Sequence, residues 1–284
     1  MEIDVKKITE SAFYKECLFP ERCEPLEEPA LWDLAVKRFA SYLKRREAKE
    51  PIPKIIHQIW VGSSLPDKYR RYCESWKKYH PHWEYRLWDD YSIQKLGLYN
   101  KRAYVLSRSF GHKSDIARYE ILYRLGGVYI DTDFECLKPL DEIIVKTSFF
   151  TGHGAGRAIC IWNGIIGSKA ANPFFLKLLA NLNKPFLSKD GMKVIAHSGP
   201  FMFKNAFMQY LKEDEEAVLF PSIYFYPWPN SPHCPRLTDE ELKKKYLKSE
   251  SFAIHYWEAS WLRPGFFMKM ASRIKQKIKR FLGL

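Results

Sequence analysis

The amino-acid sequence predicts one doubly wound α/β domain. Short apolar runs typical of strands alternate with amphipathic helical segments through most of the chain. Residues 114–133 give the clearest unit, a helix ended by Gly126 and Gly127 and followed at once by a strand, which is half of a βαβ unit. The chain has 284 residues, of which 46% are hydrophobic, so it is long enough to bury a substantial core.

The first half of the chain contains two predicted helices and two predicted strands. Apolar side chains recur at helical spacing over residues 28–50, and the prolines in 51–53 end that helix. Residues 54–62 form a short apolar run rich in β-branched residues, which predicts a buried strand and a loop. Residues 67–80 predict a helix, and residues 84–90 alternate in the manner of a strand.

The second half opens with the predicted helix over residues 114–127, for which Ser114 is the expected N-cap. A strand follows over residues 128–133, and residues 157–168 predict two strands joined by a loop. Further helices and a last strand that runs into a loop are expected over residues 172–183, 197–211 and 252–261.

The charge and the cysteines exclude several classes of protein. The net charge is +13, but six basic residues lie in residues 266–284, where no acidic residue occurs, so the basicity does not indicate one continuous nucleic-acid face. The six cysteines form no CxxC pair, which argues against a zinc site built on such pairs and favours reduced thiols. The charged N-terminus and the lack of a long apolar run predict a cytoplasmic protein without a spanning helix.

Asp131 and Asp133 stand two residues apart at the end of the predicted strand. In extended backbone residues i and i+2 point the same way, and two close carboxylates repel each other unless a cation lies between them. Mg²⁺ or Mn²⁺ suits such oxygen ligands, whereas the alternative is a strand end that meets water. Glu135 departs from the DxDx[TV] pattern of haloacid-dehalogenase-type phosphatases, and no phosphate-binding P-loop motif is present.

The segment "SDIARYEILYRLGGVYIDTDFECLKPL" resembles the signature of the DXD-containing sugar transferases of glycosyltransferase family 32, and more distantly that of the large clostridial glucosylating toxins. The resemblance covers about residues 52–262, and residues 54–140 carry most of its specificity. It implies a GT-A fold, a nucleotide-sugar donor, a divalent metal ion and retention of anomeric configuration. The matching positions are Ser114, Asp115, Arg118, Leu122, Gly126, Gly127, Tyr129, Asp131, Asp133, Pro139 and Leu140.

The resemblance assigns roles within this signature. Asp133 would bind the metal directly, and Asp131 would contact the donor ribose or sugar and reach the metal, either directly or through water. Asp115 would accept hydrogen bonds from donor-sugar hydroxyls, and Arg118 would donate near the phosphate or sugar. The alternative for the last two residues is an ion pair on the surface of a helix. No unassigned acid stands out as a nucleophile, which favours front-side substitution over a covalent intermediate.

Five residues outside the signature complete the expected site. Trp60 in "QIWVG" would stack on the nucleobase, unless it packs in the core. Asn163 would lie near the sugar or acceptor, or hold a tight turn. His255 in "HYWEASW" would be a metal ligand, or a buried hydrogen-bonded histidine. Ser260 and Trp261 would close over the diphosphate.

Three regions are expected: a helical extension over residues 1–51, a GT-A catalytic domain over 52–262, and a basic amphipathic helix over 263–284. Residues 266–284 place apolar side chains at helical spacing among basic ones, which predicts binding to an anionic membrane surface. The alternative is a helix docked on the domain.

The predicted function is a metal-dependent, retaining hexosyltransferase that is peripheral to the membrane and builds a polysaccharide or glycolipid. Its expected donor is a nucleotide sugar, with a UDP-sugar first and GDP-mannose second, and its expected cofactor is Mn²⁺ or Mg²⁺. A transferase that modifies a protein is one alternative. A basic, aromatic nucleic-acid binder is another, but it would give no reason for Asp115, Asp131 and Asp133.

Overall fold

A computed structural model describes residues 5–17, 28–154, 160–228 and 238–258, and it confirms the α/β class. The strands are β1 Ile55–Ile59, β2 Glu84–Trp88, β3 Gly127–Ile130, β4 Phe134–Cys136, β5 Phe149–Gly154, β6 Cys160–Ser168, β7 Ala217–Phe220 and β8 Ala253–His255. The helices are α1 Val5–Thr9, α2 Ala12–Lys15, α3 Pro29–Lys44, α4 Asp67–Tyr79, α5 Asp90–Leu96, α6 Lys101–Leu106, α7 Phe110–Leu125, α8 Asp141–Ile144, α9 Pro173–Asn181, α10 Gly191–His197, α11 Pro200–Glu213, α12 Ser222–Phe225 and α13 Asp239–Tyr246. None of these helices is long and apolar enough to cross a lipid bilayer.

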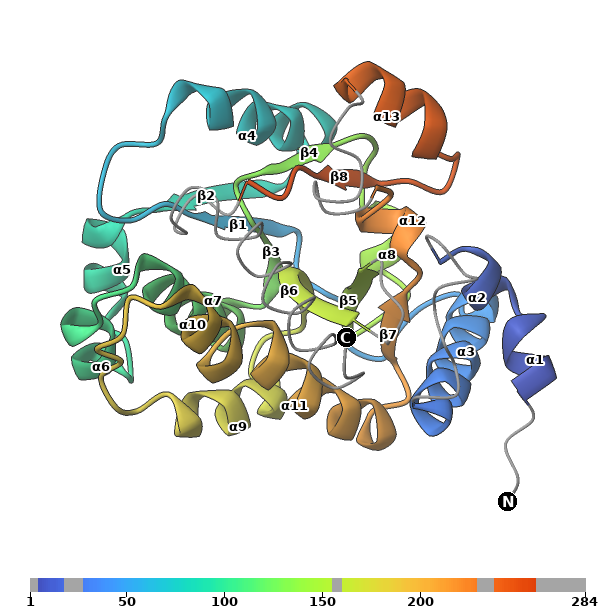
Figure 1. Cartoon of the computed structure of the whole chain (residues 1–284), viewed down its shortest axis with the longest axis horizontal. Coiled ribbons are helices and arrows are strands. Elements are labelled where there is room, and N and C mark those ends of the chain that lie inside the picture. The colour runs from blue at the N-terminus through green and yellow to red at the C-terminus, as the bar shows by residue number, and fades with distance from the viewer. Residues whose placement is uncertain (1–4, 18–27, 155–159, 229–237, 259–284) are drawn as a thin grey trace, which may run out of the picture.

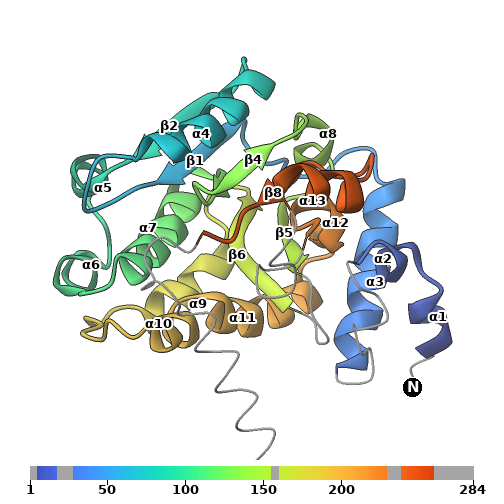
Figure 2. The same ribbon diagram turned by 45° about the horizontal axis from the view of Figure 1, so that its top comes forward.

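The central sheet has the strand order β2-β1-β3-β6-β5-β7 (Figure 1). Strand β1 runs parallel to β2 and β3, and β5 runs parallel to β7, whereas β6 is antiparallel to both of its neighbours. Strands β4 and β8 form a second, two-stranded antiparallel sheet that lies in front of the central one in Figure 2. The fold is therefore a parallel-dominated mixed sheet with a small accessory sheet.

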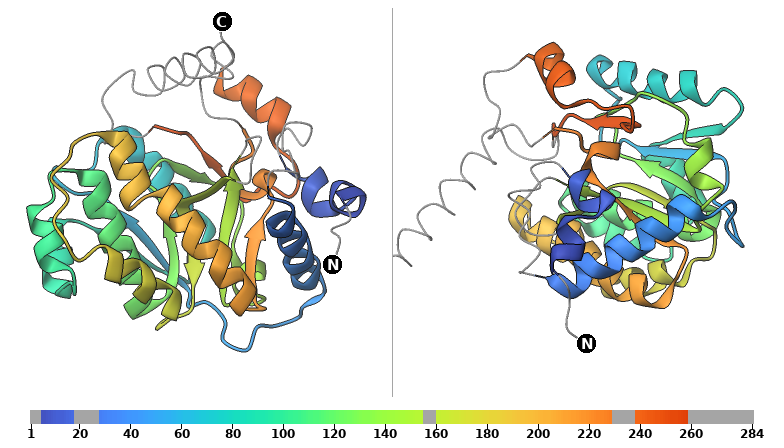
Figure 3. Two further views of the ribbon diagram at one scale, coloured as in Figure 1. Left: turned by 60° about the horizontal axis from the view of Figure 1, so that its bottom comes forward. Right: turned by 90° about the vertical axis from the view of Figure 1, so that its right-hand side faces the viewer.

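Helices cover the sheet and share its core. Helices α7, α9 and α11 pack side by side against the central sheet, and α4 packs against β4. Helix α3 packs along β7 with α1 and α2 beside it (Figure 3), so residues before 51 contribute to the main hydrophobic core. Aromatic rings dominate this core, and Phe149 illustrates the packing, because its ring lies 4.8 Å from that of Phe174 and 5.6 Å from that of Phe207.

The turn between α7 and β3 depends on the two predicted glycines. Gly126 and Gly127 have φ of +62° and +93°, a region that favours glycine. A Cβ on Gly126 would lie 2.6 Å from the Ala170 amide nitrogen, and one on Gly127 would lie 2.6 Å from the Ile55 carbonyl oxygen. The glycines thus let α7 end and β3 enter the sheet beside β1, which places the end of β3 at the site described below.

The structure differs from the sequence prediction in several details, three of which concern α7, β6 and α10. Helix α7 begins earlier than predicted, because the Ser109 side chain, not that of Ser114, accepts the capping hydrogen bond from His112. Two strands joined by a loop were predicted over residues 157–168, but residues 160–168 form the single strand β6. Its pairing with β5 continues across a register shift between Thr151 and Gly152. Helix α10 was not predicted, although Asp190 caps it through the amides of residues 192 and 193.

Candidate active site

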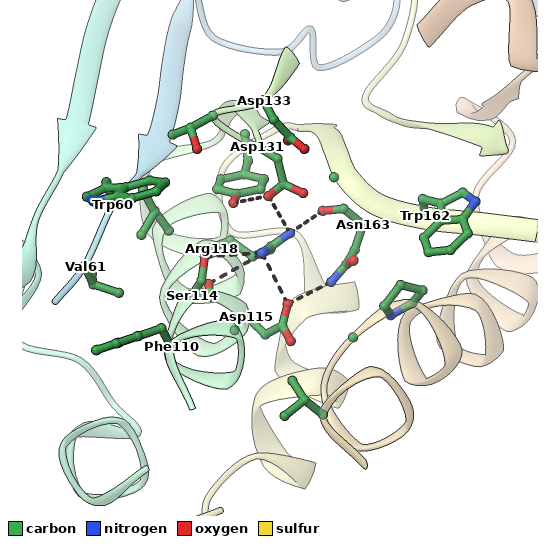
Figure 4. A pocket seen from close by; sticks show the side chains of 18 of the residues that line it. Trp60, Val61, Phe110, Ser114, Asp115, Arg118, Asp131, Asp133, Trp162 and Asn163 are labelled. Atoms are coloured by element: carbon green, nitrogen blue, oxygen red, sulfur yellow. Dashed lines mark hydrogen bonds and ion pairs between the residues drawn. The ribbon is translucent and has the colours of Figure 1, made fainter. Parts of the chain in front are cut away.

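A cavity of about 410 Å³ opens beyond the carboxyl ends of β1 and β3, where ligands bind in open α/β sheets (Figure 4). Trp60 directly follows β1, and Asp131 directly follows β3. Helix α7 supplies Ser114, Asp115 and Arg118 to the floor of the cavity. Its lining also includes Phe110, Tyr129, Asp133, Trp162, Asn163, Val194, Ile195, His255 and Trp257.

Arg118 lies buried at the centre of this floor, with 6% of its surface exposed. Its guanidinium donates to the Asn163 carbonyl oxygen at 2.6 Å and forms ion pairs with Asp131 at 3.2 Å and Asp115 at 3.4 Å. The group also lies 4.3 Å from the centre of the Tyr129 ring. The alternative of a solvent-exposed ion pair on a helix is therefore wrong, because the charges are buried beneath the cavity.

Asp115 is held by two further side chains. Asn163 Nδ2 donates to its Oδ1 at 2.9 Å, and Ser198 Oγ donates to its Oδ2 at 2.6 Å. Burial raises the pKa of Asp115 to about 6, although the Arg118 charge opposes the increase. Asn163 lies within β6 and not in a tight turn.

Asp131, Asp133 and His255 converge on one point, where an atom from each lies within 4.8 Å of the others. The prediction that the two aspartates project from one extended strand is wrong. Strand β3 ends at Ile130, and a turn at residues 132–133 leads into β4. The pairing of β4 with β8 places His255 opposite Phe134, so its Nε2 lies 3.1 Å from Asp133 Oδ1.

The electrostatic environments of the two carboxylates differ. Burial raises the pKa of Asp131, and the Arg118 charge opposes this effect. Burial alone would also raise the pKa of Asp133. The His255 imidazole and the Glu258 backbone amide bring this pKa below its ordinary value, and the amide donates to Asp133 Oδ2 at 2.9 Å. Asp133 is therefore the better charged ligand of the pair.

These three residues fit a divalent cation. Two carboxylates and an imidazole are a donor set that Mn²⁺ accepts, and Mg²⁺ accepts the carboxylates. The buried Nδ1 of His255 has no hydrogen-bond partner among the described residues, although a buried polar atom normally has one. Asp131, Asp133 and His255 would hold the ion.

Aromatic rings form two opposite walls of the cavity (Figure 4). Trp60 and Phe110 lie on one side, and the Trp60 ring packs 4.8 Å from the Tyr69 ring while its Nε1 donates to Ser63 Oγ at 3.1 Å. Trp60 remains partly exposed at the cavity, so it is not a core residue only.

Trp162 lies on the far side from Trp60, and its ring centre is 5.2 Å from that of Trp257. Neither of these tryptophans was predicted as a site residue, and neither was Ser198. Trp257 belongs to the segment "HYWEASW" that had been singled out, but Ser260 and Trp261 were chosen from it. Those two residues, like residues 266–284, lie outside the described part of the chain.

Comparisons with known proteins indicate the class to which this chain is similar. Residues 66–150 match the model of a glycosyltransferase sugar-binding region containing a DXD motif, and Asp115, Arg118, Asp131 and Asp133 all lie within that region. This match confirms the predicted resemblance to DXD-containing sugar transferases, and it supports the predicted enzyme class.

Three curated relatives are similar to the chain. Inositol phosphoceramide mannosyltransferase 1 of Schizosaccharomyces pombe is 31% identical over 193 residues, which cover 64% of this chain and 60% of the relative. The uncharacterized glycosyltransferase L373 of Acanthamoeba polyphaga mimivirus is 29% identical, with coverage of 74% and 84%. Mannosyl phosphorylinositol ceramide synthase SUR1 of Saccharomyces cerevisiae is 29% identical, with coverage of 61% and 47%. The matched region thus spans about half to three-fifths of these two yeast relatives.

Among solved structures, the catalytic domain of alpha-toxin from Clostridium novyi matches with a TM-score of 0.49 and 11% identity, covering 88% of this chain and 89% of the toxin domain.

Proposed function

We propose that this chain, whose residues 66–150 match the DXD-containing sugar-binding region of glycosyltransferases, is a metal-dependent glycosyltransferase that moves a hexose from a nucleotide sugar to a glycolipid. One observation carries the proposal. The ion pairs of Arg118 with Asp115 and Asp131 join a sugar-sized cavity to the cluster of Asp131, Asp133 and His255.

Asp115 would bind the donor sugar. Its two oxygens accept hydrogen bonds from Asn163 and Ser198, and an ionised carboxylate has further lone pairs that can accept from sugar hydroxyls. The guanidinium of Arg118 is already engaged with Asn163, Ser114 and both carboxylates. We therefore assign Arg118 the positioning of Asp115 and Asp131, and not a direct contact with the donor.

Asp131, Asp133 and His255 would hold the divalent ion beside the donor diphosphate. When bound, the ion neutralises the negative charge that develops on the departing diphosphate. The bond between the anomeric carbon and the phosphate oxygen breaks while that carbon bonds to the acceptor hydroxyl oxygen, whose proton passes to the departing phosphate oxygen. In the described part of the chain, the acids that line the cavity are Asp115, Asp131 and Asp133, and all three have other roles, which supports front-side attack over a covalent intermediate.

Mannose is the first choice of sugar. The yeast relatives carry names that report mannosyl transfer, and the sequence alone had placed a UDP-sugar before GDP-mannose. Trp60 offers a flat face to any nucleobase, so it does not select the base. GDP-mannose therefore moves ahead of the UDP-sugars in this proposal.

A glycolipid is the first choice of acceptor, because the names of the same relatives refer to inositol phosphoceramide lipids. Polysaccharide and protein acceptors are the competing classes. They are distinguished by incubating the protein with labelled donor and either inositol phosphoceramide in detergent, an oligosaccharide mixture, or a protein extract.

The donor is tested by thermal shift. Each nucleotide sugar is added with and without Mn²⁺, and we expect GDP-mannose with Mn²⁺ to raise Tm more than any UDP-sugar, since a ligand that binds only the folded state stabilises it. A larger shift in Tm with a UDP-hexose would indicate a UDP-sugar as the donor in place of GDP-mannose. No shift in Tm with any nucleotide sugar would overturn the proposed function.

A further inference from the structure

Two segments far apart in the sequence form one rim of the cavity. Residues 101–113 span α6 and the start of α7, and residues 184–201 span α10 and the start of α11. The Arg108 amide donates to the Phe186 carbonyl at 3.2 Å, and the Phe186 ring stacks on His112 at 5.0 Å and on His197 at 4.7 Å. We call this surface the basic rim.

Large apolar side chains are exposed on the basic rim. Of the eleven such side chains among the described residues, five lie here, each about half exposed: Val105 50%, Leu106 48%, Phe110 52%, Leu187 59% and Phe201 53%. Single exposed apolar residues are ordinary, but a group of them around a cavity marks an interaction surface. Phe110 also lines the cavity, so the apolar group reaches the cavity mouth.

Positive charge accompanies these side chains. Asp190 is the only acidic residue of the two segments, and it is occupied in capping α10. None of the basic residues of the two segments has a carboxylate within ion-pair distance in the described part of the chain. They are Lys101, Arg102, Arg108, Lys113, Lys184, Lys189 and Lys193.

We propose that the basic rim docks on an anionic lipid membrane and places the cavity mouth at the lipid surface. Exposed apolar side chains that insert at the headgroup boundary, together with unpaired cations, are the chemistry that such a surface recognises. The inference deepens the proposed function, on which it rests for the lipid nature of the acceptor. It is separate from the predicted membrane binding of residues 266–284, because it rests only on residues 101–113 and 184–201.

The full chain is tested for sedimentation with vesicles of phosphatidylcholine and phosphatidylserine. The double variant Lys189→Gln/Lys193→Gln should lower the partition coefficient roughly 30-fold at low salt, since each charge near the surface contributes about a factor of five. The variant Leu106→Ser/Leu187→Ser should lower it about tenfold. Matched controls away from the rim are Lys77→Gln/Lys78→Gln on α4 and Leu43→Ser on α3, which should bind as the unchanged chain does.

Unchanged vesicle binding in both rim variants, or no binding by the unchanged chain, would overturn the proposal. So would a loss confined to the lysine variant and matched by an equal loss of single-stranded RNA binding, since that pattern describes a general polyanion surface. Donor hydrolysis without vesicles is measured in the same proteins and should be unaffected. Absence of hydrolysis in the unchanged chain would overturn the proposed function but not the membrane surface, because vesicle binding is measured without donor.

Discussion

Replacement of Arg118 by methionine tests the electrostatic architecture of the site. Methionine keeps much of the length and packing of the side chain but removes the charge that faces Asp115 at 3.4 Å and Asp131 at 3.2 Å. Removing one partner of a buried ion pair costs about 3–5 kcal/mol, because an uncompensated charge stays buried. The Asn163 carbonyl oxygen also loses its 2.6 Å hydrogen bond. We expect Arg118→Met to lower the free energy of unfolding at pH 8 by about 4 kcal/mol.

The sign of the pH dependence follows from Asp115, whose pKa burial has already raised to about 6. Loss of Arg118 raises this pKa further, so the folded variant takes up a proton more readily than the folded wild type. The difference in stability between the two proteins should therefore shrink as the pH falls from 8 to 5, by about 1 kcal/mol or more for each unit of added pKa shift.

Urea unfolding followed by tryptophan fluorescence at pH 8 and pH 5 measures both effects. Arg70→Met is the matched control, because the Arg70 side chain is 61% exposed in its pair with Asp67 and such a pair contributes at most about 1 kcal/mol. The reasoning would be refuted if Arg118→Met lowered the free energy of unfolding by no more than the control does. It would also be refuted if the destabilisation by Arg118→Met increased as the pH falls.

Two further changes have specific consequences. Burial lowers the pKa of His153 to about 3, so its stabilising effect is complete above the unfolded value of about 6.5 and is lost as the pH falls toward 3. The variant His153→Phe keeps a ring between Phe13 and Trp32 but cannot take up a proton. The free energy of unfolding that the protein loses between pH 8 and pH 5 should therefore be about 2 kcal/mol smaller in the variant. Urea titrations at the two pH values measure this loss, and an equal loss in both proteins would contradict the prediction. Trp60→Ala should raise the donor KM roughly 10- to 100-fold with little change in kcat, since stacking on a base contributes about 1–3 kcal/mol, and an unchanged KM in steady-state kinetics would remove Trp60 from the nucleobase site.

Local signals made the centre of the site predictable. Helix α7, the two glycines and β3 follow one another in the sequence, so one continuous signature contained Asp115, Arg118 and Asp131. His255 was predicted as a metal ligand from the resemblance to GT-A sugar transferases. The pairing of β8 with β4 then brings it to Asp133 across more than a hundred residues.

The rest of the site depends on tertiary contacts that have no local signature. Ser198 reaches Asp115 only because α10 and α11 fold back over α7, and serine before Gly-Pro is equally typical of a loop. Trp162 lies in β6 and Trp257 follows β8, more than ninety residues later, and an aromatic-rich chain offers many equivalent candidates. Ser109 and Ser114 are both acceptable N-caps, so the choice between them was made by packing and not by propensity.

The central claim is that Asp131, Asp133 and His255 present a metal-bound nucleotide sugar, and release of free sugar from the donor tests it most directly. Hydrolysis should require Mn²⁺, stop in EDTA, and fall at least about a hundredfold in Asp133→Asn. Glu135→Gln is the matched control, since this neighbouring carboxylate pairs with Lys243 and Tyr256 away from the cluster and should retain near-normal activity. Full activity in Asp133→Asn, or in the presence of EDTA, would contradict the assignment of the site.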